Sequence, residues 1–208
     1  MTEPDWVVWA RRLTAIAQNG LWFATDRYDR DRYLQVQQIA AAMIAAGSAA
    51  EPSAILELLA ADDGYATPKV DVRGVCFDDS ERVLLVLERE DGLWTLPGGW
   101  ADPTDLPSAA VEREVAEEAG YQVRAARLLA CWDRTLQQDA QPYPWRVYKL
   151  FFDCEVLGET PRSHDETSDV GWFGSDDLPP LSPGRVTADQ IRRLAVLHRD
   201  PALPAAFH

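Results

Sequence analysis

Three carboxylates stand close together in the segment Arg113-Glu114-Val115-Ala116-Glu117-Glu118. On a helix, residues three and four apart lie on one face, so Glu114, Glu117 and Glu118 would present their side chains together. Like charges at these spacings destabilise a helix by roughly 0.2–0.5 kcal/mol per pair. A hard divalent cation would offset the repulsion, because Mg²⁺ prefers oxygen ligands. The alternative interpretation is a solvated acidic helix face, which is the usual meaning of a run of acids.

Two neighbouring features favour the metal-binding interpretation. Arg113 directly precedes the acids, and a guanidinium can hold a carboxylate through two hydrogen bonds and fix its orientation. Upstream, Leu96-Pro97-Gly98-Gly99 predicts a turn. Glycine lets the main chain approach a metal or a phosphate closely and offer a carbonyl as a ligand.

The spacing around the acids resembles the signature of the Nudix hydrolase family, G-x5-E-x7-R-E-U-x-E-E-x-G-U, in which U is a bulky aliphatic residue. Gly99 is followed after five residues by Asp105, and after seven more by the run from Arg113 to Gly120-Tyr121. Asp105 replaces the first glutamate and keeps its charge, and Tyr121 replaces an aliphatic residue. Neither departure removes a metal ligand.

The resemblance implies a role for each matching residue. Glu114 and Glu118 would be the principal metal ligands, Glu117 would complete the cluster, and the carbonyl of Gly98 would add a backbone ligand. Arg113 would orient the glutamates. The implied cofactor is Mg²⁺, with Mn²⁺ as the alternative ion. The metal would hold phosphate oxygens and activate a water for displacement at phosphorus.

The signature does not name the general base. In several enzymes of the family, a glutamate on a later loop has this role. Here the segment 163–167 lies in such a loop, so Glu166 is the candidate, with a surface loop residue or an auxiliary metal ligand as alternatives. His164 is a second candidate, although a lone histidine in a loop is more often simply solvated.

Four further side chains are candidates for substrate contacts. Arg73 and Arg89 are expected to flank the site from adjacent strands and hold substrate phosphate, or else to form ion pairs with the many acids. Trp100 and Trp145 lie in or near predicted loops, where either could stack on a base or cap the pocket.

The rest of the chain predicts two domains, residues 1–64 and 65–208. The first reads as helices, because apolar residues recur at spacings of three and four from Trp6 to Ala17 and again over 29–46 and 53–61, with Gly20 interrupting or ending the first helix. The second predicts strands near 70–77, 83–88, 123–132, 147–156 and 170–173, and helices over 108–119 and 187–198. The expected fold is α/β (α+β): an α/β/α sandwich around a mixed sheet, preceded by a small all-helical domain.

Segments outside the signature are similar to one bacterial Nudix subgroup. They are Trp9-Ala10-Arg11-Arg12, the stretches 15–21 and 29–33, Thr67 to Gly74, and Leu96 to Trp100. This subgroup includes CDP-choline pyrophosphatases and hydrolases of nucleoside diphosphates linked to a group X. The resemblance implies a homodimer, with the helical domain supporting dimerisation and the substrate pocket. It also implies cleavage of CDP-choline to CMP and phosphocholine, or of an ADP-ribose-like compound.

Net charge and composition indicate which binding partners the protein is expected to have. The formal charge of −14 disfavours duplex DNA and makes RNA a secondary partner, while a small phosphorylated substrate remains compatible because divalent metal neutralises charge locally. The three cysteines show no zinc spacing. The N-terminus lacks a basic signal-peptide region, and no apolar run is long enough for a membrane span, which predicts a cytoplasmic protein. Two alternatives stay open: a pyrophosphohydrolase of nucleoside triphosphates or RNA ends, and a non-catalytic Nudix sensing module.

Overall fold

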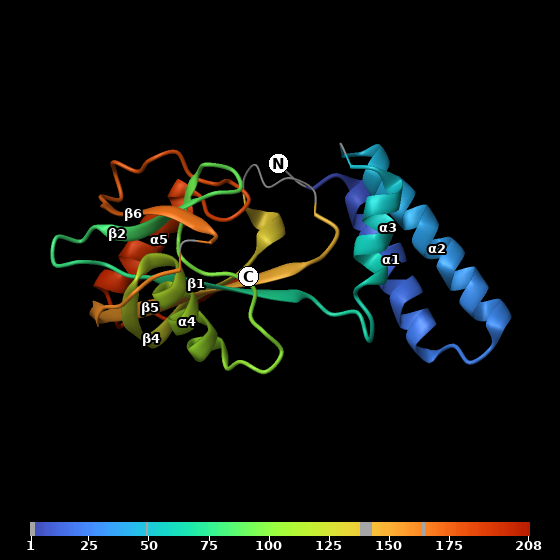
Figure 1. Ribbon diagram of the computed structural model, residues 1–208, viewed down its shortest axis with the longest axis horizontal. Helices are drawn as coiled ribbons and strands as arrows, with labels where there is room; N and C mark the ends of the chain where they lie inside the picture. The colour runs from blue at the N-terminus through green and yellow to red at the C-terminus, as the bar shows by residue number, and fades with distance from the viewer. Residues whose placement is uncertain (1–2, 49, 138–142, 164) are drawn as a thin grey trace. The chain divides into compact units, whose positions relative to one another are not determined.

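The computed structural model describes residues 3–48, 50–137, 143–163 and 165–208. The chain divides into two compact units, shown in Figure 1. Residues 1–69 and 141–146 form one unit, which we call the helical unit. Residues 70–140 and 147–208 form the other, which we call the sheet unit. The candidate His164 lies outside the described residues.

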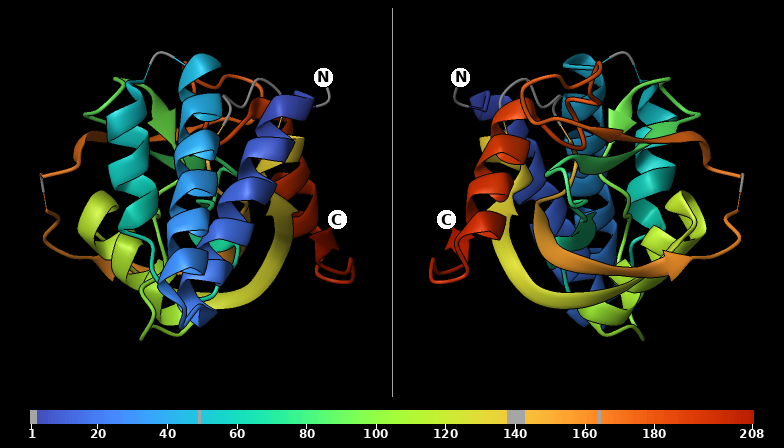
Figure 2. Two further views of the ribbon diagram at one scale, coloured as in Figure 1. Left: turned by 90° about the vertical axis from the view of Figure 1, so that its right-hand side faces the viewer. Right: turned by 90° about the vertical axis from the view of Figure 1, so that its left-hand side faces the viewer.

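The helical unit contains α1 (Asp5–Phe23), α2 (Arg27–Ala46) and α3 (Pro52–Ala60), which pack side by side in Figure 2. Its core is small and is formed mainly by Ala10, Ala41, Ile44, Ile55 and Leu59. The prediction that Gly20 interrupts the first helix is wrong. Helix α1 continues to Phe23. The ring of Tyr33 packs directly against Gly20, where an added Cβ would lie 2.3 Å from the nearest ring atom.

The described residues of the sheet unit form two sheets. One has the strand order β1-β5-β4-β7 and the other has the order β3-β2-β6. The long strands β4 and β5 pair antiparallel and run together in Figure 2, whereas β4 and β7 pair parallel, so this sheet is mixed as expected. The strands are β1 (Lys69–Val75), β2 (Val83–Glu88), β3 (Trp94–Thr95), β4 (Tyr121–Asp133), β5 (Val147–Glu159), β6 (Thr167–Phe173) and β7 (Ala206–Phe207).

Two helices cover the sheets and complete the predicted α/β/α arrangement. Helix α4 (Pro107–Ala119) buries Ala110, Val111 and Val115 in one core cluster. Helix α5 (Ala188–Arg199) buries Ile191 and Leu194 in a second cluster. Strand β2 serves both cores, because its consecutive side chains point to opposite sides: Leu84 and Val86 join the first cluster, and Val83 and Leu85 join the second.

The ends of the elements differ from the predicted ends by a few residues. Helix α4 begins at Pro107, one residue before the predicted start at 108, and its N-cap residue Leu106 makes no side-chain cap. Thr187 caps α5 through a reciprocal capping box with Gln190. Among the described residues, no helix has both the length and the apolar character needed to cross a membrane.

Candidate active site

A glycine turn lies against helix α4 at the centre of the candidate site. Gly98 has φ of +138°, and an added Cβ would lie 2.0 Å from the carbonyl oxygen of Val72, so glycine is required at this position. The carbonyls of Pro97 and Gly99 accept hydrogen bonds from the amides of Gly74 and Val72 on β1. This pairing fixes the turn.

Glu114, Glu117 and Glu118 line the same cavity, and Arg113 holds the first two. Its Nη1 atom is 2.9 Å from Glu114 Oε1 and 3.2 Å from Glu117 Oε2. Its Nη2 atom lies 3.2 Å from Asp105 Oδ2. Asp105 therefore ties the loop before α4 to the helix, despite being one methylene shorter than the glutamate of the family signature. Asp102 Oδ2 lies 3.7 Å from the same Nη2 atom, so one guanidinium serves four carboxylates.

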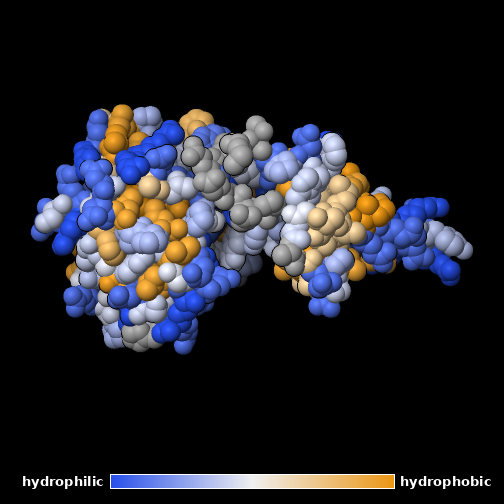
Figure 3. All heavy atoms as spheres, turned by 90° about the horizontal axis from the view of Figure 1, so that it is seen from above, coloured by the Kyte–Doolittle hydropathy of each residue, from blue (hydrophilic) through white to orange (hydrophobic). Residues whose placement is uncertain are grey.

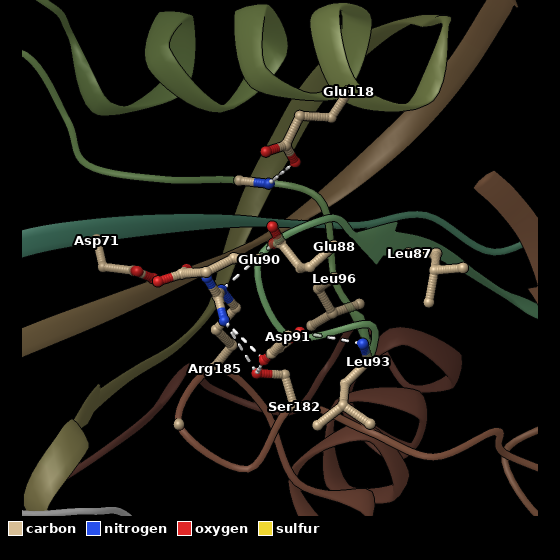
Figure 4. A network of polar contacts seen from close by, with 12 residues as sticks. Asp71, Leu87, Glu88, Glu90, Asp91, Leu93, Leu96, Glu118, Ser182 and Arg185 are labelled. Atoms are coloured by element: carbon tan, nitrogen blue, oxygen red, sulfur yellow. Dashed lines mark hydrogen bonds and ion pairs between the residues drawn. The ribbon is translucent and has the colours of Figure 1, made fainter. Parts of the chain in front are cut away.

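Glu118 is the most deeply placed acid of this group, with 6% of its surface exposed. Its Oε2 accepts a hydrogen bond of 2.8 Å from the Gly98 amide, drawn as a dashed line in Figure 4. Burial raises the pKa of Glu118 to about 8, and the charges of Glu88 and Glu114 act in the same direction. The Arg73 guanidinium and the Gly98 amide oppose this shift. Without a further cation, this carboxylate therefore holds its proton unusually firmly.

A cavity of about 570 Å³ opens in front of α4, within the sheet unit. The predicted residues Arg113, Glu114, Glu117, Glu118 and Glu166 all line it. The structure therefore brings the candidate base loop and the helical acids to one cavity, although about fifty residues separate them in sequence. The remaining lining residues are Gly99, Trp100, Asp102, Ser163, Asp165 and Thr167.

Hydrogen bonds hold Ser163 and residues 165–167 in place. The Glu166 carbonyl accepts a hydrogen bond of 3.0 Å from the amide of Arg89. The Thr167 hydroxyl donates a bond of 2.9 Å to the carbonyl of Glu118. The Ser163 hydroxyl donates to the Asp165 carboxylate. Arg89 therefore supports the loop through its backbone, and its exposed side chain is not among those that line the cavity.

Arg73 is placed differently from the expectation of a strand arginine facing the substrate. It is 4% exposed, and its Nε and Nη2 atoms donate to the Asp71 carboxylate at 2.9 and 2.8 Å. Its Nη1 atom donates to the carbonyl of Leu96, next to the glycine turn. Lys149 completes the group, with its Nζ atom 3.1 Å from Asp71. Arg73 is absent from the cavity lining, and its bond to the Leu96 carbonyl supports the glycine turn instead.

Sequence reasoning missed a second charged group, which Figure 4 shows beside Glu118. Glu88, at the end of β2, is 7% exposed and lies 3.3 Å from Arg185 Nε. Arg185 also pairs with Glu90 and with Asp91, whose carboxylate accepts a hydrogen bond from Ser182. The signal for Glu88 was weak: it is a single acid at the end of the apolar run Val83–Leu87. Its partner Arg185 is almost one hundred residues away, so no local pattern could reveal the pair.

The donor set fits a hard cation by its chemistry, because the Glu114, Glu117 and Glu118 carboxylates and the Gly98 carbonyl are all oxygen ligands. Within the described part of the chain, however, no three His, Cys, Asp or Glu side chains are gathered as a ready ligand cluster. The reason is visible in the contacts: Arg113 holds Glu114 and Glu117, and the Gly98 amide holds Glu118. A bound cation would replace these contacts.

Comparison with known proteins matches both units. The family model described as "NUDIX domain" matches residues 67–194, which is more than half of the chain. The model described as "UDP-X-like, N-terminal oligomerisation domain" matches residues 4–59. The chain therefore belongs to the Nudix family, and its Nudix domain follows an N-terminal domain of this UDP-X-like kind.

Individual relatives are similar over most of the chain. The protein YjhB of Bacillus subtilis (strain 168), named "Putative ADP-ribose pyrophosphatase", is 39% identical over 99% of this chain and 98% of its own. A crystal structure of a UDP-X diphosphatase is 30% identical, covers all of both chains and has a TM-score of 0.63. An ADP-ribose pyrophosphatase from Streptococcus suis is 39% identical over 68% of this chain and all of its own, with a TM-score of 0.61.

Proposed function

We propose that this Nudix pyrophosphatase hydrolyses the pyrophosphate bond of a nucleoside diphosphate linked to a group X, in a metal-dependent reaction. One observation carries the proposal: the α4 acids and Glu166, from distant parts of the sequence, line one cavity of about 570 Å³. A volume of that size is typical of sites for small organic ligands. The printed names of the relatives, ADP-ribose pyrophosphatase and UDP-X diphosphatase, support the substrate class.

The residues at the cavity would divide the chemistry among them. Glu114, Glu117, Glu118 and the Gly98 carbonyl would hold Mg²⁺ or Mn²⁺, and the ion would supply charge neutralisation at the phosphate oxygens. Arg113 would keep the glutamates oriented and leave its close contact with Glu114 when the cation binds. Glu166, which also lines the cavity, is proposed to accept the proton of the attacking water as general base.

The two arginines named as phosphate contacts are assigned different roles. Because Asp71 and Leu96 occupy three of its donor atoms, Arg73 is proposed to position the glycine turn and not to hold phosphate. Arg89 stays a candidate for a contact with substrate through its exposed side chain. Trp100, which is 48% exposed and lines the cavity, is the aromatic candidate for a contact with a base or with X.

A homodimer is proposed to form through the helical unit. The match to an oligomerisation domain supports this, as do large apolar side chains on the surface of the unit, where orange atoms are visible in Figure 3. Burying such side chains against a second copy would remove them from water, and contiguous exposed apolar surface is typical of interfaces. The exposed residues include Trp9, Ile16, Trp22, Phe23 and Ile39.

The test is a hydrolysis assay in Mg²⁺ with separated products. The panel contains ADP-ribose, CDP-choline, a UDP-sugar, a nucleoside triphosphate and a short 5′-capped RNA. We expect a mononucleotide and a phosphorylated X from at least one of the first three. CDP-choline as the preferred substrate is the narrowest form of the proposal, and preference for ADP-ribose would change only the identity of X. Hydrolysis of the triphosphate alone, or of nothing, would contradict the proposal.

A matched control shows whether a measured activity comes from this cavity. Glu114→Gln combined with Glu118→Gln should abolish turnover, whereas Glu155→Gln, an exposed acid on β5, should not change it. Omission of metal with EDTA should abolish turnover of the unmodified protein. Activity that persists in EDTA would contradict the metal-dependent part of the proposal alone.

A further inference from the structure

Arg185 contacts three acids of the turn that joins β2 to β3, which we call the β2–β3 turn (residues 88–93). Its Nε atom lies 3.3 Å from Glu88 Oε1, its Nη1 atom lies 3.0 Å from Asp91 Oδ2, and its Nη2 atom contacts Glu90. Figure 4 shows these side chains converging on the guanidinium. The donors of a guanidinium form a rigid planar fork, so one arginine can fix several acceptors in defined directions. Arg185 therefore holds the β2–β3 turn in one conformation.

The segment that carries Arg185 is itself attached to the sheet. The main chain of residues 180–182 pairs with Trp94 on β3 through two hydrogen bonds, of 3.0 and 2.8 Å. Val186, the residue after Arg185, is fully buried in the core cluster that contains α5. The backbone on both sides of Arg185 is thus fixed, so this side chain determines where the turn lies relative to the core.

The β2–β3 turn in turn holds the main chain of Glu166. Glu88 is the register partner of Thr167, and the amide of Arg89 donates a hydrogen bond of 3.0 Å to the Glu166 carbonyl. The register between β2 and β6 shifts between Leu87 and Glu88, so the regular pairing of the two strands is interrupted just before this point. A contact from a side chain can supply the order that the interrupted pairing does not.

A carboxylate is a costly choice for position 88. Glu88 is 7% exposed, and burial raises its pKa, with Arg185 opposing the shift and the charges of Asp91 and Glu166 adding to it. A buried ion pair is often no more stabilising than apolar residues of the same volume, so stability alone does not explain the pair. Neither Glu88 nor Arg185 lines the cavity, so a direct contact with substrate does not explain it either.

We propose that Arg185 is a positioning residue for the hydrolysis, which holds Glu88 and the β2–β3 turn and thereby fixes the main chain of Glu166 at the cavity. This inference rests on the proposed function, in which Glu166 is the general base. A catalytic group displaced by about 1 Å can lower the rate by about 10²-fold. Loss of Arg185 should therefore affect kcat and leave KM almost unchanged, because the contacts that bind the substrate remain.

The first test is a double-mutant cycle between Arg185 and Glu166. Arg185→Gln should lower kcat about tenfold in the unmodified protein. In the Glu166→Gln background the same substitution should lower kcat less than about twofold, because the group that Arg185 positions is already lost. Arg192→Gln, which removes an exposed arginine on α5, is the matched control and should change kcat in neither background. An equal loss in both backgrounds, or no loss in either, would overturn the inference.

A second variant distinguishes the geometry of Arg185 from its charge. Arg185→Lys keeps the positive charge but lacks the planar fork, so it should recover less than half of the lost kcat. Melting temperatures of both variants show whether the protein remains folded. Full recovery of kcat by the lysine would show that only the charge at this position matters, and would overturn the positioning role.

The last test needs no substrate. Amide hydrogen exchange, followed residue by residue by NMR, should be about fivefold or more faster at Arg89 in Arg185→Gln than in the unmodified protein. The amide of Gly120, which donates to the Ala116 carbonyl at the end of α4, should exchange at an unchanged rate. Unchanged exchange at Arg89 would overturn the inference. An unreduced kcat in Glu166→Gln alone would instead refute the proposed base, which separates the failure of the proposed function from the failure of this inference.

Discussion

The sheet unit contains two charged groups that meet at the glycine turn and are balanced in opposite ways. In the first, Asp71 is shared by Arg73 and Lys149, and the spare donor of Arg73 is satisfied by the carbonyl of Leu96. In the second, Glu114, Glu117 and Asp105 share the single guanidinium of Arg113, while the buried Glu118 has only an amide hydrogen bond. The first group has more cations than anions, and the second has a surplus of acids.

The difference indicates that the Asp71 group stabilises the fold, whereas the acids of α4 need a ligand to balance their charge. The Asp71 group is almost fully buried, and both of its cations contact the Asp71 carboxylate, so it acts as an internal support for β1, β5 and the turn. The acids of α4 line a cavity and lack matching positive charge, which is costly in a folded protein unless something compensates. This contrast makes the acidic group the functional one, and the following variants test it.

The largest effect is expected from removing the acidic surplus. Glu114→Gln with Glu118→Gln should lower kcat on the order of 10³-fold or more, equivalent to about 4 kcal/mol, because the cation would lose its principal ligands. The melting temperature in EDTA should stay the same or rise, because repulsion is relieved. Both are measured on one purified sample, and a large loss of stability would show that these acids are structural.

Removing the shared carboxylate of the Asp71 group should instead lower the stability of the protein. Asp71→Asn leaves Arg73 and Lys149 buried without a counter-charge, so the free energy of unfolding should fall by about 3–5 kcal/mol. Urea denaturation followed by far-UV circular dichroism measures this. The same substitution at Asp189, whose pair with Arg192 is exposed, should cost less than about 1 kcal/mol. Similar losses of unfolding free energy at Asp71 and Asp189 would show that the Asp71 group does not stabilise the fold more than an exposed ion pair does.

The candidate base is tested next. Glu166→Gln should lower kcat about 10²-fold with little change in KM, and should flatten the acidic limb of the pH–rate profile, because the proton acceptor is lost. Asp165→Asn, one residue earlier and also in the cavity lining, is the matched control and should change kcat less than about threefold. A larger loss at Asp165 than at Glu166 would reassign the role.

The smallest effect concerns pH. Burial lowers the pKa of Lys149 to about 8 from its ordinary value of 10.5, with Arg73 adding to the shift and Asp71 opposing it. Between these two pH values the unfolded state binds more protons than the folded state, so stability rises with pH. The unmodified protein should therefore gain about 1–3 kcal/mol relative to Lys149→Met across this window. Urea titrations at pH 7.5 and 10 check the sign, and a relative loss would refute the assignment.

The sequence predicted those parts of the site that lie within one stretch of chain. The register from Gly99 to Gly120 placed Glu114, Glu117 and Glu118 on one helical face, because helix geometry is local. Helix α4 begins within one residue of the prediction and ends at Ala119, as predicted, with Gly120 as its C-cap residue at φ of +74°. The mixed sheet and the two covering helices also followed from apolar patterns and turn residues.

What the sequence could not supply was pairing across the fold. Arg73 seemed suited to phosphate, because nothing near it in sequence shows that Lys149 shares its partner Asp71. The link between Glu88 and Arg185 was hidden for the same reason. The error at Gly20 has a similar origin: a glycine normally weakens a helix, but here the ring of Tyr33 fills the space above it.

The geometry of Gly98 limits how a designer could redirect this protein to new substrates. Any side chain there would meet the main chain of β1, and β1 also bears Arg73, so the turn and the strand can change only together. Segments 100–106 and 163–166 are less constrained, because most of their described side chains are exposed. Libraries for altered specificity should therefore randomise these two segments apart from Asp105 and Glu166, and leave residues 96–99 untouched.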